Sequence, residues 1–179
     1  IHGVEAAEVN GKPVLVSGCG PIGLMAIGAC KVHGAAKIIA CDMFDQKLEL
    51  AKEMGADLVV NSGKEDIIQA VRNATGGHGA DAAIDITGNG KAINAGLKAL
   101  RKGGIFVSVG LPDGEIPVNL TEDIIYREIV YTGVSGRRMF ETWEDCMNIL
   151  KSDGFSLAPA MGNTYKFEDF EDAFAAIRA

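Results

Sequence analysis

Short apolar runs alternate with amphipathic segments along most of the chain, and glycine residues separate many of them. The apolar runs are short and end at turn residues, so they predict buried strands. These expected strands lie at 13–17, 37–42, 57–60, 80–86, 105–110 and 128–134. The intervening segments carry apolar residues at helical spacing and predict helices at 1–11, 21–33, 46–54, 64–75, 91–100, 121–126, 140–151 and 168–179. This order predicts an α/β fold with a doubly wound, parallel, six-stranded sheet and helices on both of its faces.

Two stretches near the end of the chain depart from this alternation. Ile116–Leu120 has apolar residues at alternate positions and contains Pro117, which cannot donate to a strand ladder, so it predicts an edge strand. Tyr165–Phe167 predicts a brief extended piece. We therefore expect a first helix at 1–12, a main domain at 13–152 and an extension at 153–179. The helical pattern starts and stops abruptly, and we expect the chain to be part of a longer one.

A glycine-rich turn joins the first expected strand to the next helix. Its sequence, Gly18-Cys19-Gly20-Pro21-Ile22-Gly23, has the Gly-x-Gly-x-x-Gly spacing of dinucleotide-binding turns. The first glycine permits the tight turn, the second a close approach to a pyrophosphate, and the third close packing of the helix on the sheet. The free N–H groups and the positive dipole end of the helix favour a bound anion. The alternative is a glycine-rich turn that binds no ligand.

An acidic residue follows this turn at the distance expected for a Rossmann site. Asp42 ends the second strand and could accept hydrogen bonds from the ribose hydroxyls of the adenosine half of the cofactor. Because a carboxylate repels a 2′-phosphate, and because Met43 and Phe44 offer no arginine to receive one, NAD is expected rather than NADP. Lys47 could reach the ribose or could be a surface lysine paired with neighbouring glutamates, and both interpretations stay open.

The ends of the later strands should complete the site, because ligands of such sheets bind outside the carboxyl ends of the strands. The expected adenosine or pyrophosphate contacts are Thr87 and Gly88, and the expected nicotinamide contacts are Gly110, Leu111, Val134 and Ser135. Asp85 could contribute, or it could be a buried acid that holds the following loop. Arg137 and Arg138 could meet a phosphate or only solvent.

Hydride transfer from an alcohol requires a metal ion or a general base, and the sequence offers neither. The three histidines are His2, His33 and His78, and none lies at metal-ligand spacing from Cys, Asp or Glu. A Tyr-x-x-x-Lys pair near the cofactor and a serine with a partner histidine are also absent from the sequence. We therefore predict no catalytic and no metal-ligating residue in this chain.

Composition narrows the range of partners. The formal net charge of −7 argues against nucleic acid and anionic membranes as partners. No apolar run reaches the roughly 18 residues that span a bilayer. The four cysteines lack Cys-x-x-Cys spacing, which predicts reduced and mostly buried thiols in a cytoplasmic protein.

Three segments carry a family resemblance. Val16–Ala26, Ala40–Asp42 and Leu48–Asp57 closely resemble the cofactor domain of the medium-chain, zinc-dependent alcohol dehydrogenases. Gly136–Trp143 and Asp169–Arg178 further resemble the threonine-dehydrogenase branch of that family. The resemblance implies an oxidoreductase that transfers a hydride from a secondary alcohol, threonine-like or a polyol, to NAD.

The resemblance also implies parts that this chain lacks. Family members hold the zinc in a catalytic domain that precedes the cofactor domain, so 1–12 would be the linker helix from that domain and 153–179 would lead back toward it. They are dimers or tetramers, which implies a homo-oligomer formed through the edge at 116–120. The alternative is a stand-alone nucleotide-binding module that regulates without catalysis. A Gly-His-Glu motif upstream in the gene, with a cysteine before it, would support the dehydrogenase.

Overall fold

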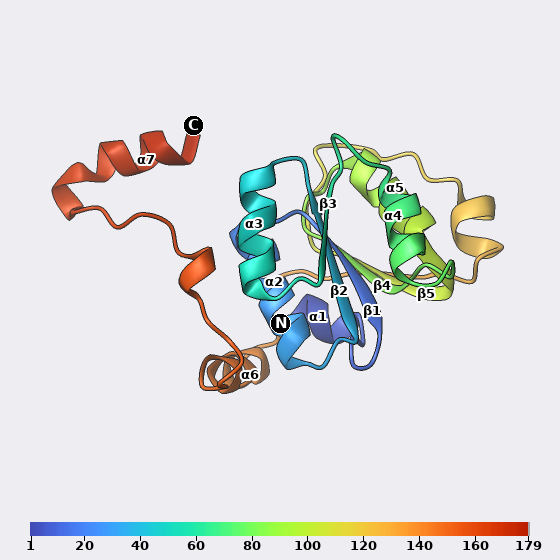
Figure 1. The fold of residues 1–179 in the computed structure, drawn as a ribbon, viewed down its shortest axis with the longest axis horizontal. Helices are drawn as coiled ribbons and strands as arrows, with labels where there is room; N and C mark the ends of the chain where they lie inside the picture. The colour runs from blue at the N-terminus through green and yellow to red at the C-terminus, as the bar shows by residue number, and fades with distance from the viewer. Residues whose placement is uncertain (179) are drawn as a thin grey trace.

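The computed structural model describes residues 1–178 and contains one parallel sheet of six strands (Figure 1). The strands are β1 (Pro13–Ser17), β2 (Lys37–Asp42), β3 (Leu58–Asn61), β4 (Ala80–Asp85), β5 (Leu100–Ser108) and β6 (Val130–Gly133). The α-helices are α1 (His2–Ala6), α2 (Pro21–Val32), α3 (Asp45–Met54), α4 (Ile67–Ala74), α5 (Gly90–Ala99), α6 (Glu141–Leu150) and α7 (Phe170–Arg178). The expected last residue of the final helix, Ala179, lies outside the described residues. The predicted doubly wound, six-stranded α/β fold is confirmed.

Helices cover both faces of the sheet because its central strands are apolar on both sides (Figure 1). Along β1, Val14 and Val16 point into one core, which α1, α2 and α3 cover. Leu15 points into the other core, which α4 and α5 cover. The alternating positions of one buried strand thus hold the two helical layers together.

The strand order is β3-β2-β1-β4-β5-β6, so the chain reverses its direction of winding between β1 and β4. At such a point the helices that follow neighbouring strands leave toward opposite faces, and a crevice opens at the carboxyl ends of the strands. The turn after β1 and the loop after β4 border this point. The fold therefore places the glycine-rich turn where α/β proteins bind nucleotides.

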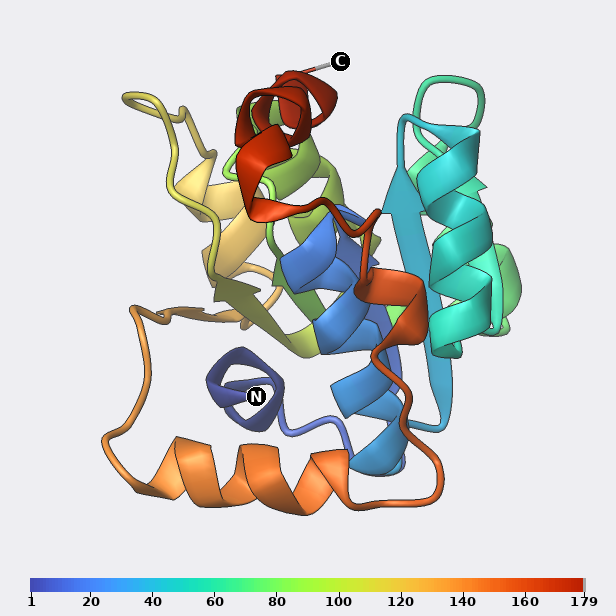
Figure 2. The same cartoon turned by 90° about the vertical axis from the view of Figure 1, so that its left-hand side faces the viewer.

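The C-terminal part leaves the sheet. Figure 2 shows α6 running below α1, and Figure 1 shows α7 apart from the other helices. Phe155, in the segment between them, packs against α2 at Gly28. A Cβ at Gly28 would lie 2.5 Å from Cε2 of the Phe155 ring. Phe170 and Phe174 of α7 are exposed. None of the described helices combines the length and the apolar character that a membrane crossing requires.

The expected edge strand at Ile116–Leu120 is wrong. In the structure β6 forms that edge of the sheet, next to β5. Ile116 and Val118 instead pack against the core under α5, and Asn94 Nδ2 donates to the Pro117 carbonyl oxygen at 3.2 Å. The alternating apolar residues are thus explained by packing on a helix rather than by pairing with a strand.

Several expected boundaries also move. The expected helix at 1–11 ends at Ala6, because the chain turns at Glu8, whose φ is +49°, and buries Val9. The fifth strand starts at Leu100, which pairs with Ala80 ahead of a register shift. Residues 120–125 form a π-helix, with Tyr126 N–H donating to the Thr121 carbonyl at 3.0 Å. The expected extended piece at 165–167 is wrong at Phe167, which begins a 3₁₀ turn that leads into α7, whereas Lys166 before it has extended backbone angles.

Candidate dinucleotide-binding site

The three glycines of the turn after β1 meet three different surroundings. Gly18 has a φ of +94°, and a Cβ there would lie 2.8 Å from Thr87 Cγ2. A Cβ at Gly23 would lie 1.8 Å from the Gly18 carbonyl oxygen, whereas a Cβ at Gly20 would meet nothing within 4 Å. Gly18 and Gly23 are therefore required by the fold itself. Gly20 faces open space, as a close approach by a ligand would require.

The helix that follows presents free backbone donors to this space. Pro21 occupies the first turn of α2, Gly20 is its N-cap, and no side chain caps the end. No acidic residue lies in that turn to offset the positive end of the helix dipole. Twelve residues of helix aligned behind this end make it a suitable place for a phosphate group. The contacts of Pro21 and Ile22 with a cofactor stay predictions.

Asp42 joins the glycine-rich turn to the loop after β2. Its Oδ2 accepts a hydrogen bond from Cys19 N–H at 2.8 Å, within the glycine-rich turn. Its Oδ1 accepts from the N–H groups of Met43 at 2.8 Å and Phe44 at 3.1 Å. A carboxylate offers about four acceptor positions, so one is left for a ribose hydroxyl. The structure thus brings together the turn and the acid that lie apart in the sequence.

Lys47 lies in the first turn of α3, directly after this loop, and does not form the ion pair that was one of its two possible roles. Its Nζ lies 4.8 Å from the centre of the Phe44 ring, a cation–π geometry. Glu49 is paired with Lys52 instead, at 2.7 Å. A contact between Lys47 and the ribose stays a prediction.

Asp85 is a buried acid that fixes two loops at once. It is 1% exposed, and its carboxylate accepts from Thr87 Oγ1 at 2.7 Å and Gly88 N–H at 2.9 Å. Its main-chain carbonyl accepts from Val109 and Gly110 N–H at 2.9 and 3.0 Å. Burial raises the pKa of this carboxyl, and the Thr87 and Gly88 hydrogen bonds oppose that rise. The geometry supports the interpretation of Asp85 as a residue that holds the following loop.

The loops after β4 and β5 meet through their backbones. A Cβ at Gly88 would lie 2.5 Å from the Leu111 carbonyl oxygen, and one at Gly110 would lie 2.2 Å from Gly88 N. Leu111 is 87% exposed in the loop after β5. Val134 N–H donates to the Ser108 carbonyl oxygen at 2.9 Å, which holds the end of β6 beside the end of β5. The expected cofactor contacts therefore share one edge of the sheet, and each stays a prediction.

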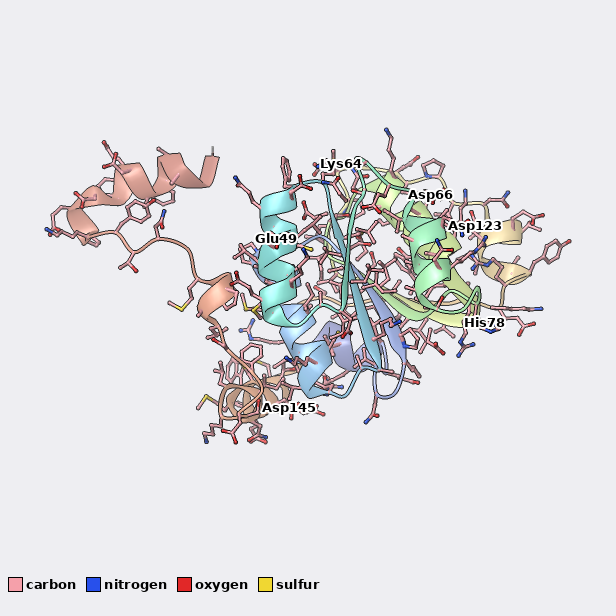
Figure 3. All side chains as sticks on the ribbon, in the orientation of Figure 1. Glu49, Lys64, Asp66, His78, Asp123 and Asp145 are labelled. Carbon is pink, nitrogen blue, oxygen red and sulfur yellow. The ribbon has the colours of Figure 1, made fainter. Side chains whose placement is uncertain are left out.

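Other candidate residues lie elsewhere. His78 precedes β4 and so lies at the amino edge of the sheet, opposite the edge of Lys64 and Asp66 (Figure 3). Arg138 pairs with Glu5 and Glu141 and ties α6 to α1, and Arg137 stacks on Trp143 with 5.4 Å between its guanidinium carbon and the ring centre.

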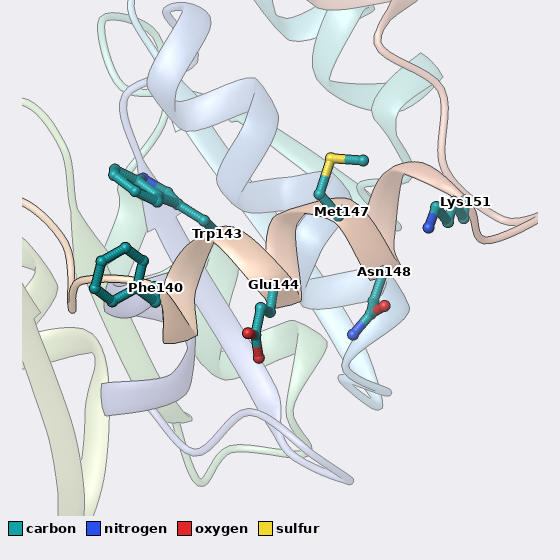
Figure 4. A pocket seen from close by; sticks show the side chains of 6 residues that line it. All are labelled: Phe140, Trp143, Glu144, Met147, Asn148 and Lys151. Atoms are coloured by element: carbon teal, nitrogen blue, oxygen red, sulfur yellow. The ribbon is translucent and has the colours of Figure 1, made fainter.

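Residues 1–178 contain no group of three or more His, Cys, Asp or Glu side chains that could hold a metal ion. The described residues therefore do not fit a zinc site. A shallow hollow of about 490 Å³ does exist along α6, and no residue of the glycine-rich turn lines it (Figure 4). Its lining consists of Phe140, Trp143, Glu144, Met147, Asn148 and Lys151.

Sequence reasoning missed Asn61, the last residue of β3. Asn61 is buried, and its side chain holds the loop that carries Asp42. The available signal was a polar residue at the carboxyl end of a buried strand beside Asp42. The two acceptors of its side-chain N–H groups, Asp45 and Met43, are 16 and 18 residues away in the sequence, so local pattern alone could not identify them.

Comparison with known proteins identifies the family. Residues 21–152 match the family model described as zinc-binding dehydrogenase. The chain belongs to the zinc-binding dehydrogenase family. The chain is 40% identical over 172 residues to L-threonine 3-dehydrogenase of Caldanaerobacter subterraneus, a match that covers 96% of this chain and 50% of that protein. It is 36% identical to L-threonine 3-dehydrogenase of Bacillus subtilis over 100% of this chain and 52% of that protein.

Solved structures of dehydrogenases share the fold of this chain. The 2R,3R-butanediol dehydrogenase of Bacillus subtilis superimposes with a TM-score of 0.89 at 26% identity, covering 98% of this chain and 50% of that one. L-idonate 5-dehydrogenase of Escherichia coli gives a TM-score of 0.83 at 30% identity, covering 99% and 51%. The chain thus spans about half the length of the relatives it matches, and the expected family resemblance is confirmed.

Proposed function

We propose that this chain is the NAD-binding half of a dehydrogenase that oxidises a secondary alcohol. The observation that carries the proposal is the 2.8 Å hydrogen bond between Asp42 Oδ2 and Cys19 N–H. It holds a ribose-binding acid against the turn that would cradle a pyrophosphate. Because the acid would repel a 2′-phosphate and no arginine follows it, the proposed cofactor is NAD rather than NADP.

Each part of the crevice edge has a proposed role. The backbone of Gly18–Gly23 and the start of α2 bind the pyrophosphate, and the open space at Gly20 admits it. Asp42, with Met43 and Lys47 beside it, binds the adenosine ribose. Thr87 and Gly88 border the adenosine or pyrophosphate region. The backbones of Gly110–Leu111 and Val134–Ser135 face the nicotinamide, where exposed N–H and C=O groups suit a carboxamide.

Bound NAD supplies one piece of chemistry, which is the acceptance of a hydride from the alcohol carbon. The residues of this chain bind and orient the cofactor, and the described ones offer no group that would deprotonate an alcohol. We place the zinc and the alcohol in the part of the full-length protein outside this chain, since the relatives are twice as long. A threonine-like or polyol substrate is supported by the names of the relatives. A stand-alone regulatory module loses support, because the matches are to dehydrogenases.

The same proposal accounts for the ends of the molecule. Residues 1–12, which contain α1, serve as a linker, and 13–152 serve as the NAD-binding domain. Residues 153–179 serve as the path back toward the other half, which would cover the exposed apolar side chains of α6 and α7. Association into a homo-oligomer would use the sheet edge formed by β6, where Val130 and Tyr131 are exposed, together with the 116–120 segment. A cytoplasmic location stays a prediction, and the free state of the four cysteines supports it.

A titration tests the central part of this proposal. The 179-residue chain should bind NADH weakly and raise its nicotinamide fluorescence. Saturating NADH should also raise the melting temperature, because a ligand that binds only the folded state stabilises it. A chain that changes neither signal up to millimolar NADH would contradict the proposal.

A further inference from the structure

Asn61 lies beside Asp42 at the carboxyl edge of the sheet. The two residues are register partners at the ends of β3 and β2. Asn61 is 5% exposed, so its amide is nearly removed from water. Buried amides need partners for their polar atoms, and the identity of those partners shows what such a residue holds in place.

The Asn61 side chain uses its oxygen and its nitrogen on three segments. Its Nδ2 donates to the Met43 carbonyl at 3.2 Å and to Asp45 Oδ1 at 2.5 Å. Its Oδ1 accepts from Gly63 N–H at 2.9 Å. A carbonyl and a carboxylate can only accept and a backbone N–H can only donate, so these partners determine the orientation of the amide. Asn61 therefore ties the loop after β2 and the first residue of α3 to the loop after β3.

An ion pair supports the Asp45 end of this arrangement. Lys64 Nζ lies 2.5 Å from Asp45 Oδ2, at the edge of the sheet where Lys64 is labelled in Figure 3. The hydrogen bonds from Lys64 and Asn61 lower the pKa of Asp45, so this carboxylate stays ionised and continues to accept from Asn61.

Met43 transmits the constraint to Asp42. Its carbonyl accepts from Asn61, while its own N–H donates to Asp42 Oδ1 at 2.8 Å. The opposite oxygen of the Asp42 carboxylate accepts from Cys19 N–H. We propose that Asn61 is a positioning residue that aims the Asp42 carboxylate and thereby sets the preference of the site for a ribose with a free 2′-hydroxyl. This inference rests on the proposed function.

The specificity follows from the geometry of a carboxylate. A fixed carboxylate can accept hydrogen bonds from ribose hydroxyls in a set direction, and it repels a phosphate at the same place. When Asn61 no longer holds the loop after β2, the Asp42 carboxylate can rotate away from the position of the ribose hydroxyls and of the phosphate. Binding of the unphosphorylated ribose then loses a charge-assisted hydrogen bond, whereas binding of the phosphorylated one loses a repulsion.

The test replaces Asn61 and uses two probes that differ by one phosphate. Asn61→Ala removes the amide without adding charge, and Asn73→Ala, on the exposed side of α4, is the matched control. Calorimetry measures the binding of ADP-ribose and of 2′-phospho-ADP-ribose to the 179-residue chain. Asn61→Ala should weaken ADP-ribose binding by roughly tenfold, which corresponds to about 1.4 kcal/mol. Binding of the phosphorylated probe should stay within about threefold, and the control should change neither.

A second readout needs no ligand. Hydrogen exchange of the Cys19 amide, followed by NMR, reports on its bond to Asp42, and it should accelerate in Asn61→Ala but not in Asn73→Ala. A purely structural role would lower the melting temperature of Asn61→Ala and leave the ratio of the two dissociation constants unchanged, which would overturn the inference. Wild-type chain that binds neither probe would instead contradict the proposed function.

Discussion

The substitution Gly23→Ala should destabilise the protein, although alanine normally favours a helix over glycine by about 1 kcal/mol. The added Cβ would lie 1.8 Å from the Gly18 carbonyl oxygen, and both partners belong to the backbone. Carbon–oxygen contacts are about 3.3 Å or longer, so α2 or the turn must move by about 1.5 Å. Overpacking of this kind costs about 1–3 kcal/mol, and we expect the upper end because no flexible side chain can yield.

Thermal unfolding followed by circular dichroism measures this effect. At about 2–4 °C per kcal/mol for a chain of this size, the melting temperature should fall by about 6–12 °C. The matched control is Gly20→Ala, because a Cβ there meets nothing within 4 Å and φ is −70°. The control should cost less than about 1 kcal/mol but weaken NADH binding, since its methyl group occupies the space left for the pyrophosphate. A melting temperature of Gly23→Ala at or above that of the wild type would refute the reasoning.

Three further predictions concern single side chains. Arg127→Met should lower the free energy of unfolding by about 2 kcal/mol, because it removes the guanidinium that donates to main-chain carbonyls at the end of α5. An unchanged midpoint of urea unfolding would contradict this prediction. Burial raises the pKa of Cys19 to about 12, so iodoacetamide should label the half-exposed Cys146 before Cys19. Equal labelling of the two cysteines by mass spectrometry would contradict this, because it would show that the Cys19 thiol is accessible. Because burial raises the pKa of Asp85 in the folded state, its contribution to stability is fully present below the usual Asp pKa and is lost as pH rises through the raised value. The unfolding free energy of the wild type, measured in urea, should therefore fall relative to that of Asp85→Asn from about pH 4 upward. A difference between the two free energies that stays constant with pH would contradict this prediction.

The layers of the fold follow from the sequence because buried parallel strands carry their signal locally. Residues 38–41 within the strand at 37–42 are apolar on both faces, as is typical of a central strand of a parallel sheet. The failures have tertiary causes. Ile116 and Val118 alternate as a strand would, but they pack under α5, and no local pattern distinguishes the two. Leu100 begins β5 directly after α5 because it pairs with Ala80, which lies twenty positions earlier in the sequence.

The candidate site divides in the same way. Gly18, Gly23 and Asp42 could be predicted because their spacing reflects one strand–turn–helix unit and the strand after it. Two hydrogen bonds, from Cys19 to Asp42 and from Asn61 to Met43, join loops that come together only when the sheet forms. Sequence spacing points to the residues that we propose to contact a ligand more readily than to those that we propose to position them, because the latter act through partners on other strands.

The most direct test of the central claim is the ratio of the NADPH and NADH dissociation constants, measured by nicotinamide fluorescence. In the wild-type chain NADPH should bind at least roughly tenfold more weakly than NADH, because Asp42 repels the 2′-phosphate. In the double variant Asp42→Gly, Met43→Arg the order should reverse, since the acid is replaced by a cation suited to phosphate. Equal affinities in the wild type, or an unchanged ratio in the variant, would contradict the assignment of this edge of the sheet as an NAD site.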